Sequence, residues 1–209
     1  MSDKKVMFKV RNLTKEFKIR GKKIGEKPQI LHALSDVSVD IYEGETLGVI
    51  GESGCGKSTF GKCLVQLHKA TAGSVEYEGR NIFELKGNDL KKLKRDIQMV
   101  FQDPFSSLDP RMTAGQLVEE PMIVHKIVTD KAERKKRALE LLQTVGLNVQ
   151  HVHRYPHEFS GGQRQRINIA RALSLTPKLI VCDEPVSALD VSIQAQVLNL
   201  FNQLQRQYH

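Results

Sequence analysis

Apolar residues along the chain are spaced as in strands that alternate with helices. Short alternating or β-branched runs predict strands at residues 6–10, 37–41, 46–50, 73–78, 97–101 and 179–182. Helical spacing predicts helices at residues 57–68, 90–95, 131–145, 160–173 and from residue 192 to the end of the chain. This order favours an α/β fold.

A helical stretch runs from residue 113 to about residue 153 and predicts a helical insertion. Within it, residues 131–145 place an apolar stripe on one side of a helix and most of the charged residues off it. The stripe consists of Ala138, Leu139, Leu142 and Val145. A basic, glycine-containing stretch at residues 18–27 predicts a loop.

Length and charge bound the class of protein. The 209 residues suit one domain with an insertion, and 40% hydrophobic residues exclude wholesale disorder. The net charge of +8 would suit a nucleic-acid partner. Residues 1–28, however, hold ten Lys or Arg and three Asp or Glu, whereas residues 29–209 hold 22 Lys or Arg and 21 Asp or Glu. The body is therefore nearly neutral, and the basic segment is interpreted as a solvated loop, with anionic lipid headgroups as the alternative.

Membrane spans and secretion are not indicated. The longest apolar run has four residues, at 179–182, and the polar first residues lead into no signal sequence, so the cytosol is the default compartment. The cysteines, Cys55, Cys63 and Cys182, are odd in number and predict small buried hydrophobic side chains rather than disulfides. Three histidines near residue 153 are interpreted as surface residues, with a metal site as the weaker alternative.

Residues 51–58 (GESGCGKS) match the phosphate-binding pattern GxxxxGK[ST] between a predicted strand and a predicted helix. Glycines let backbone N–H groups approach phosphate oxygens at a helix N-terminus. Lys57 would reach the β- and γ-phosphates, and the Ser58 hydroxyl would ligate Mg²⁺. The candidate nucleotide-binding residues here are Gly51, Ser53, Gly54, Cys55, Gly56, Lys57, Ser58 and Thr59.

Two acidic residues, Asp183 and Glu184, follow the predicted strand at residues 179–182. The carboxyl end of a strand is where an open α/β sheet places its ligand chemistry. Asp183 is suited to hold Mg²⁺ through its water shell, and Glu184 to polarise an attacking water. The alternative to these roles is that both acids are simply solvated side chains after a core strand. That alternative would be favoured if no phosphate-binding loop preceded them.

A second candidate phosphate-binding surface opens the helix at residue 160, within residues 159–163 (FSGGQ). One nucleotide does not need two such loops, so a dimer with composite sites is the hypothesis. A plain helix cap at Ser160 is the alternative. The candidate residues are Ser160, Gly161, Gly162 and Gln163.

With these motifs the chain resembles the ATP-binding-cassette (ABC) ATPases over nearly all its length. Residues 51–58 resemble the family's Walker A motif, residues 159–163 its signature, and residues 183–184 its Walker B aspartate and catalytic glutamate. The resemblance makes Gln102 the Q-loop glutamine, which in the family contacts Mg²⁺ or the attacking water, and residues 187–190 the D-loop. It places Phe17 where an aromatic ring stacks on adenine, although a phenylalanine near a strand end is more often core.

A finer resemblance comes from residues 102–113 (QDPFSSLDPRMT) and 185–192 (PVSALDVS). These stretches are similar to those of the oligopeptide, dipeptide and nickel importer ATPases, above all the F-type ATPase of oligopeptide permeases. The resemblance implies an ATPase that uses ATP and Mg²⁺ and pairs with a second ABC ATPase subunit, itself or a paralogue. It implies docking on transmembrane permease subunits at the cytoplasmic face of the membrane, an extracytoplasmic solute-binding protein as an indirect partner, and no nucleic acid.

The resemblance also implies how the domain is divided. We expect one ABC ATPase domain over residues 1–209: an ATP-binding core part at 1–112 with an antiparallel β subdomain, a helical subdomain at 113–160, and the signature helix, Walker B motif and D-loop at 161–209. In the family a further core strand and a switch-loop histidine follow the last helix, whereas this chain stops at His209. The expectation is a C-terminally truncated chain that hydrolyses ATP weakly.

Three other functions are alternatives to peptide import. A soluble ABC ATPase acting on nucleic acid or the ribosome would need a basic folded body, which the charge distribution does not provide. A nickel importer ATPase would share the same motifs, because the ATPase does not touch the cargo. For the full-length parent protein, a nucleotide sensor without hydrolysis is disfavoured by the presence of Lys57, Asp183 and Glu184. For the truncated chain it stays an alternative.

Overall fold

The computed structural model describes residues 5–19 and 28–208. The chain divides into two compact units, Met1–Leu90 and Lys91–His209. Most of the loop expected at residues 18–27 lies outside the described residues, as do residues 1–4 and His209. The boundaries expected at residues 112 and 160 stay predictions.

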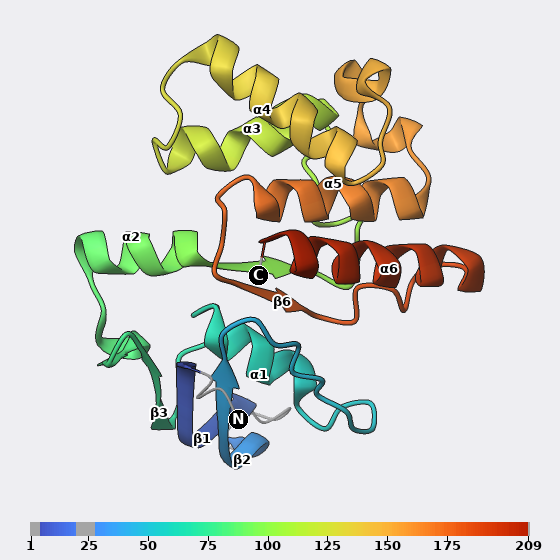
Figure 1. Cartoon of the computed structure of the whole chain (residues 1–209). Helices are drawn as coiled ribbons and strands as arrows, with labels where there is room; N and C mark the ends of the chain where they lie inside the picture. Colours follow the sequence, from blue (N-terminus) through green and yellow to red (C-terminus); the bar gives the residue numbers. More distant parts are fainter. Residues whose placement is uncertain (1–4, 20–27, 209) are drawn as a thin grey trace. The chain divides into compact units, whose positions relative to one another are not determined.

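The first unit is built on an antiparallel sheet with the strand order β2-β1-β3-β4 (Figure 1). Its strands are β1 (Val6–Ile19), β2 (Gln29–Tyr42), β3 (Ala72–Tyr77) and β4 (Arg80–Asn81). Phe8 and Tyr77 face each other on neighbouring strands and stack at 4.7 Å between ring centroids. The predicted antiparallel β subdomain is confirmed. β1 pairs with β2 from Val6 to Ile19, beyond the residues 6–10 that its apolar pattern predicted, with several register shifts along the pairing.

Helix α1 (Lys57–Leu64) begins where predicted but ends four residues before residue 68. It stops because Gln66 takes a left-handed conformation, with φ of 58°. A short 3-10 helix, η1 (Ile82–Glu84), follows β4.

The strand predicted at residues 46–50 is wrong. These residues have no regular structure, and the Ile50 side chain is 96% exposed. Their β-branched composition favours an extended backbone, but a strand also needs a neighbour to satisfy its N–H and C=O groups. Within the described residues, neither sheet contains this segment.

The second unit holds two parallel strands, β5 (Ile97–Val100) and β6 (Leu179–Cys182), paired from Ile97↔Leu179 to Val100↔Cys182. Phe101, predicted as the last strand residue, lies beyond β5 and is 38% exposed. Helix α2 (Gly87–Asp96) leads into β5 across the boundary of the two units.

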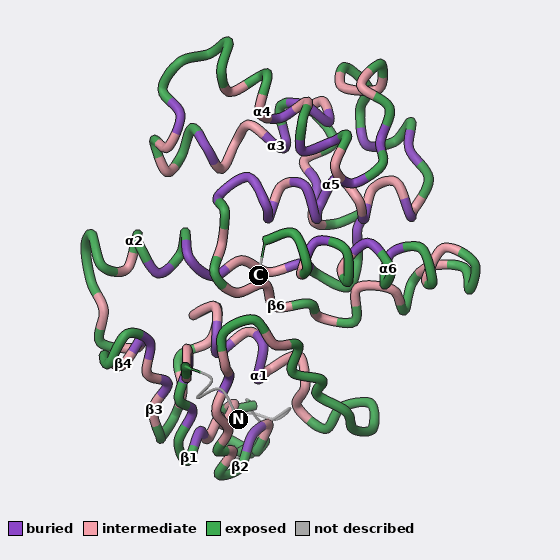
Figure 2. The backbone as a smooth tube through the Cα atoms, in the orientation of Figure 1, coloured by how far each residue is buried: buried purple, intermediate pink, exposed green. Residues whose placement is uncertain are grey.

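Helix α5 (Gly161–Leu173) is the centre of the second unit. Helices α3 (Ala114–Val124) and α4 (Lys131–Thr144) pack on it from one side and α6 (Val191–Tyr208) from the other (Figure 1). Most of α5 is buried, as its purple trace in Figure 2 shows. Two short 3-10 helices, η2 (Val149–His153) and η3 (Pro156–Glu158), precede it.

Three side-chain predictions need correction. In α4 the buried stripe contains Leu141 rather than Leu139, because residues 138, 141, 142 and 145 follow the helical period. Of the cysteines only Cys63 is buried, and burial raises the pKa of its thiol. Cys55 and Cys182 are exposed because one lies in the loop before α1 and the other ends β6.

Two of the histidines near residue 153 lie against aromatic rings. His151 packs edge-on against Phe159, and His157 stacks on Tyr155. Among residues 5–19 and 28–208, no helix combines the length and apolar character needed to cross a bilayer.

Candidate active site

The loop before α1 is shaped to receive an anion. Gly56 caps the helix in a left-handed conformation, with φ of 100°, and no side chain caps the N-terminus. A Cβ atom on Gly56 would lie 2.2 Å from the carbonyl oxygen of Ala33, so only glycine fits. The first turn of α1 carries no acidic residue, and its backbone N–H groups are therefore suited to phosphate oxygens.

The ammonium group of Lys57 lies inside this loop. Lys57 Nζ donates hydrogen bonds to the carbonyl oxygens of Gly51 at 2.8 Å and Glu52 at 2.7 Å. The predicted nucleotide-binding residues of the first unit occupy the loop and the first turn of α1: Gly51, Ser53, Gly54, Cys55, Gly56, Lys57, Ser58 and Thr59. A lysine folded into a loop of backbone dipoles is a source of positive charge for phosphates.

Phe17 lies on β1, opposite Leu31 of β2. Its ring is partly exposed, has Lys15 Nζ 4.8 Å from its centroid, and meets His68 edge-on at 5.2 Å. Phe17 is therefore not a fully buried core residue. Its contact with adenine stays a prediction.

In the second unit the structure brings Gln102 and Glu184 together. Gln102 Nε2 donates hydrogen bonds to Glu184 Oε2 at 3.0 Å and to Ser187 Oγ at 3.1 Å. Ser187 Oγ in turn donates to the carbonyl oxygen of Glu184 at 3.1 Å. The amide of Gln102 thus orients the carboxylate that the sequence proposes as the catalytic base.

The backbone holds Glu184 at a sharp turn after β6. The N–H of Asp183 donates to the carbonyl oxygen of Val100 at 3.0 Å, which extends the strand pairing by one residue. Glu184 then takes a left-handed conformation, with φ of 44°, which is unfavourable for a residue with a side chain. A strained backbone persists only where the surrounding structure enforces it, and such residues cluster at functional sites.

The predicted signature residues open α5. Ser160 Oγ accepts a hydrogen bond from the N–H of Gln163 at 3.3 Å, and Gln163 Oε1 accepts one from the N–H of Ser160 at 3.0 Å. This is a capping box, so the helix-cap alternative describes the structure. A hydroxyl that accepts one hydrogen bond still has its own proton to donate, so the cap also leaves Ser160 suited to an anion.

The sequence analysis did not predict the hydrogen bonds that hold the loop after Gln102. Asn168 and Arg171 of α5 donate hydrogen bonds to Ser107, and Gln165 donates one to Phe101. The signal was that Gln165 and Asn168 are polar at positions buried within α5. The loop also has a hydrogen bond of its own, from the N–H of Phe105 to the carboxylate of Asp103. This bond is the main cause that lowers the pKa of Asp103 from its ordinary value.

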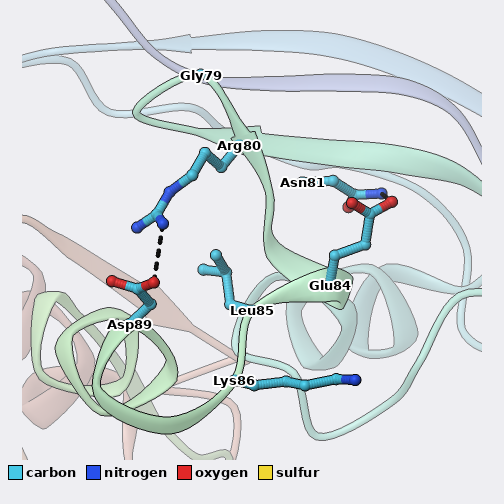
Figure 3. Close-up of a pocket in the computed structure, with 7 residues that line it drawn as sticks. All are labelled: Gly79, Arg80, Asn81, Glu84, Leu85, Lys86 and Asp89. Carbon is cyan, nitrogen blue, oxygen red and sulfur yellow. Dashed lines mark hydrogen bonds and ion pairs between the residues drawn. The ribbon is translucent and has the colours of Figure 1, made fainter.

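A separate pocket of about 520 Å³ lies in the first unit, between the turn before β4 and the start of α2. Figure 3 shows Arg80 and Asp89 turned toward each other in it, paired at 2.8 Å. The remaining lining residues are Gly79, Asn81, Glu84, Leu85 and Lys86. None of the residues predicted for the nucleotide site lines this pocket.

The fold and the site together define a P-loop nucleotide-binding protein, with an antiparallel β unit and a helix-rich unit that carries a glutamate after a parallel strand. The chain belongs to the ABC transporter family, whose model matches residues 34–187.

Similar proteins agree with this assignment. The dimeric structure of the ATP-binding cassette MJ0796, in a post-hydrolysis state bound to ADP and Pi, has a TM-score of 0.82 and 37% identity, over 96% of this chain and 84% of that one. The predicted ABC ATPase fold is confirmed by this match. Relatives include the oligopeptide transport ATP-binding proteins OppF of Bacillus subtilis, 56% identical over 84% of this chain, and of Escherichia coli, 50% identical over 98%.

The chain spans 58% of the B. subtilis OppF and 62% of the E. coli OppF. It also matches 32% of the glutathione import ATP-binding protein GsiA of Pectobacterium atrosepticum, at 51% identity over 97% of this chain. The dipeptide transport ATP-binding protein DppF of Lactococcus lactis is 50% identical over 98% of this chain, which covers 64% of it. The resemblance to ATP-binding subunits of the oligopeptide and dipeptide group is therefore confirmed.

The residues present fit Mg-ATP by their chemistry. The uncapped N-terminus of α1 and the Lys57 ammonium suit the phosphates. The oxygens of Ser58, Gln102 and Asp183 are the kind of ligand that Mg²⁺ prefers.

Proposed function

We propose that this chain forms the ATP-hydrolysing part of an ABC importer subunit that energises the uptake of peptides. The observation that carries the proposal is the hydrogen bond from Gln102 to Glu184, at the carboxyl end of a parallel strand pair in a chain with a P-loop. Similarity to proteins named for oligopeptide, dipeptide and glutathione transport supports peptides as the cargo class.

In this proposal each motif has one role. Residues 51–59 bind the phosphates of ATP, Lys57 balances their charge, and Phe17 contacts adenine. Ser58, Gln102 and Asp183 would hold Mg²⁺, which would supply positive charge to the phosphates. Glu184, oriented by Gln102, aligns the attacking water and accepts its proton, so catalysis rests on positioning and electrostatics.

We also propose that two subunits act as a pair. Ser160, Gly161, Gly162 and Gln163 of one subunit would bind the γ-phosphate of the ATP held by the other. The dimeric form of the similar cassette MJ0796 supports this arrangement. Transmembrane permease subunits and an extracytoplasmic solute-binding protein would complete the importer, with this chain at the cytoplasmic face of the membrane.

The test is Glu184→Gln in the assembled importer, with Glu140→Gln as the matched control, because Glu140 is exposed on α4. Glu184→Gln is expected to lower ATP turnover at least about 100-fold and to retain ATP-dependent dimerisation. Glu140→Gln is expected to turn over ATP like the unmodified protein. Turnover near the unmodified rate in Glu184→Gln would contradict the assignment of Glu184.

The cargo class is tested separately. Vesicles that contain the assembled importer are expected to take up a labelled oligopeptide in the presence of ATP and its solute-binding protein, and to lose that uptake with Glu184→Gln. ATP-dependent uptake of nickel without uptake of peptide would contradict peptide as the cargo.

A further inference from the structure

We propose that Asn168 and Arg171 on α5 are positioning residues that hold Gln102 against Glu184, through Ser107 and the loop after Gln102. This inference rests on the proposed ATPase function and deepens it. It assigns a role to side chains outside the nucleotide-binding motifs, which act on the reaction only through Gln102.

Both neighbours of Gln102 are anchored. Gln165 Nε2 donates a hydrogen bond to the carbonyl oxygen of Phe101 at 3.4 Å, on one side of Gln102. Ser107 Oγ donates one to the carbonyl oxygen of Asp103 at 3.0 Å, on the other side. Gln102 itself is exposed, so these neighbouring contacts, rather than burial, set the course of its backbone.

Ser107 is the residue that α5 holds. Asn168 Nδ2 donates to Ser107 Oγ at 2.8 Å, and Arg171 Nη1 donates to the carbonyl oxygen of Ser107 at 3.0 Å. The Ser107 hydroxyl thus accepts from Asn168 and donates to the backbone of Asp103 at the same time. Its orientation is therefore fixed by two partners.

Hydrogen bonds within the loop connect Ser107 to Asp103. The carboxylate of Asp103 accepts hydrogen bonds from the N–H groups of Phe105 at 2.8 Å and Ser106 at 3.3 Å. Residues 103–107 therefore form a closed turn. A displacement of Ser107 moves Asp103, and with it the adjacent Gln102.

The restraint reaches beyond α5. Arg171 Nη2 also donates to Glu120 Oε2 of α3 at 2.9 Å, so α3, α5 and the loop form one hydrogen-bonded group. The same helix begins at Ser160, which we propose to contact the partner's nucleotide. The helix that holds the Gln102 loop is therefore the same helix whose start carries the signature residues.

Packing alone does not account for Asn168. It is only 7% exposed, and its neighbours along α5, Ile167, Ile169 and Ala170, are fully buried apolar residues. An apolar side chain would fill this position without the desolvation of an amide. The amide is explained by the hydroxyl that it holds.

The test is a double-mutant cycle on ATP turnover in the assembled importer. Asn168→Ala is expected to lower kcat about tenfold and to change KM less than about threefold. In a Gln102→Ala background, Asn168→Ala is expected to lower kcat no further, because it acts through Gln102. An equal fall in kcat in both backgrounds would overturn the proposal.

Ser107→Ala provides a second variant, which breaks the same hydrogen bond from the loop side and leaves every α5 side chain in place. It is expected to lower kcat as Asn168→Ala does, and unchanged kcat in both would overturn the proposal. Arg166→Ala is the matched control, because Arg166 lies on the same helix but donates its hydrogen bonds to Val145 and Gln196, away from the Gln102 loop. It is expected to lower thermal stability and to retain kcat.

A spectroscopic measurement separates this inference from the proposed function. The side-chain amide resonance of Gln102 in ¹H–¹⁵N spectra reports its position whether or not ATP is hydrolysed. The resonance is expected to shift in Asn168→Ala and Ser107→Ala and to stay in place in Arg166→Ala. An unshifted resonance in both variants would refute the positioning role, whereas full turnover in Glu184→Gln would refute only the proposed catalytic role.

Discussion

Gln102 Nε2 lies 3.0 Å from Glu184 Oε2, although 82 positions separate the two residues in the chain. The register of the parallel strands explains this contact. Val100, the last residue of β5, is paired with Cys182, the last residue of β6. Gln102 and Glu184 each lie two positions beyond the end of their strand. Parallel strands end at the same edge, so their following residues meet there.

The first prediction concerns the charge of this pair. Gln102→Glu would place two carboxylates against each other, and like charges make it harder to ionise both. Because the proposed base has to be ionised, the acidic limb of the kcat profile is expected to move to higher pH by about one unit. Gln102→Ala serves as the control: it loses the hydrogen bond without adding a charge, so it should lower kcat and move the limb less than Gln102→Glu does. An unmoved limb in Gln102→Glu would show that the carboxylates do not meet during turnover.

The second prediction compares two glycines of the P-loop. Gly54 has φ of 81° and open space around the position of a Cβ, whereas at Gly56 a Cβ would meet the carbonyl oxygen of Ala33 at 2.2 Å. Gly54→Ala is expected to lower the free energy of unfolding by about 1 kcal/mol, from backbone strain alone. Gly56→Ala adds a clash and is expected to cost at least about 3 kcal/mol. Denaturant unfolding measures both, and equal losses would contradict the close approach of Ala33.

The sequence predicted the start of α5 well because the signal for it is local. The N-terminus of α5 was predicted from Ser160 and two glycines, and the capping box there involves residues only three positions apart. The strand at residues 46–50 was predicted wrongly for the opposite reason, because strand formation depends on a partner elsewhere in the chain.

The network around Ser107 could not be predicted from the sequence. Its bonds to Asn168 and Arg171 join residues 61 and 64 positions apart, and no local pattern specifies such pairs. The order of the motifs indicated that Gln102 and Glu184 belong to one site. The hydrogen bonds that hold the Gln102 loop required the structure.

The third prediction separates helix capping from nucleotide contact. Thr113 caps α3 with the same capping box that Ser160 provides for α5. Ser160→Ala and Thr113→Ala are each expected to lower the free energy of unfolding by about 1 kcal/mol. Only Ser160→Ala is expected to weaken ATP-dependent dimerisation, measured by light scattering. A similar loss of dimerisation in both variants would mean that Ser160 acts only as a cap.

The fourth prediction concerns pH and the end of the loop after Gln102. Hydrogen bonds from the Arg111 side chain, and then from its backbone N–H, lower the pKa of Asp109 to about 2. Since this pKa is below that of the unfolded chain, about 3.9, the pairing stabilises the folded chain above pH 4 and is lost as the pH falls toward 2.

Carboxyl ¹³C spectra recorded as a function of pH test this directly. Arg111→Ala is expected to raise the midpoint of Asp109 but to leave it below the unfolded value, because the variant removes the guanidinium and keeps the backbone N–H. Asp103 is the internal control: the N–H of Phe105 is the main cause that lowers its pKa, so its titration should not respond to Arg111→Ala. If Asp109 of the unmodified chain titrates near 4, Arg111 does not hold it in solution.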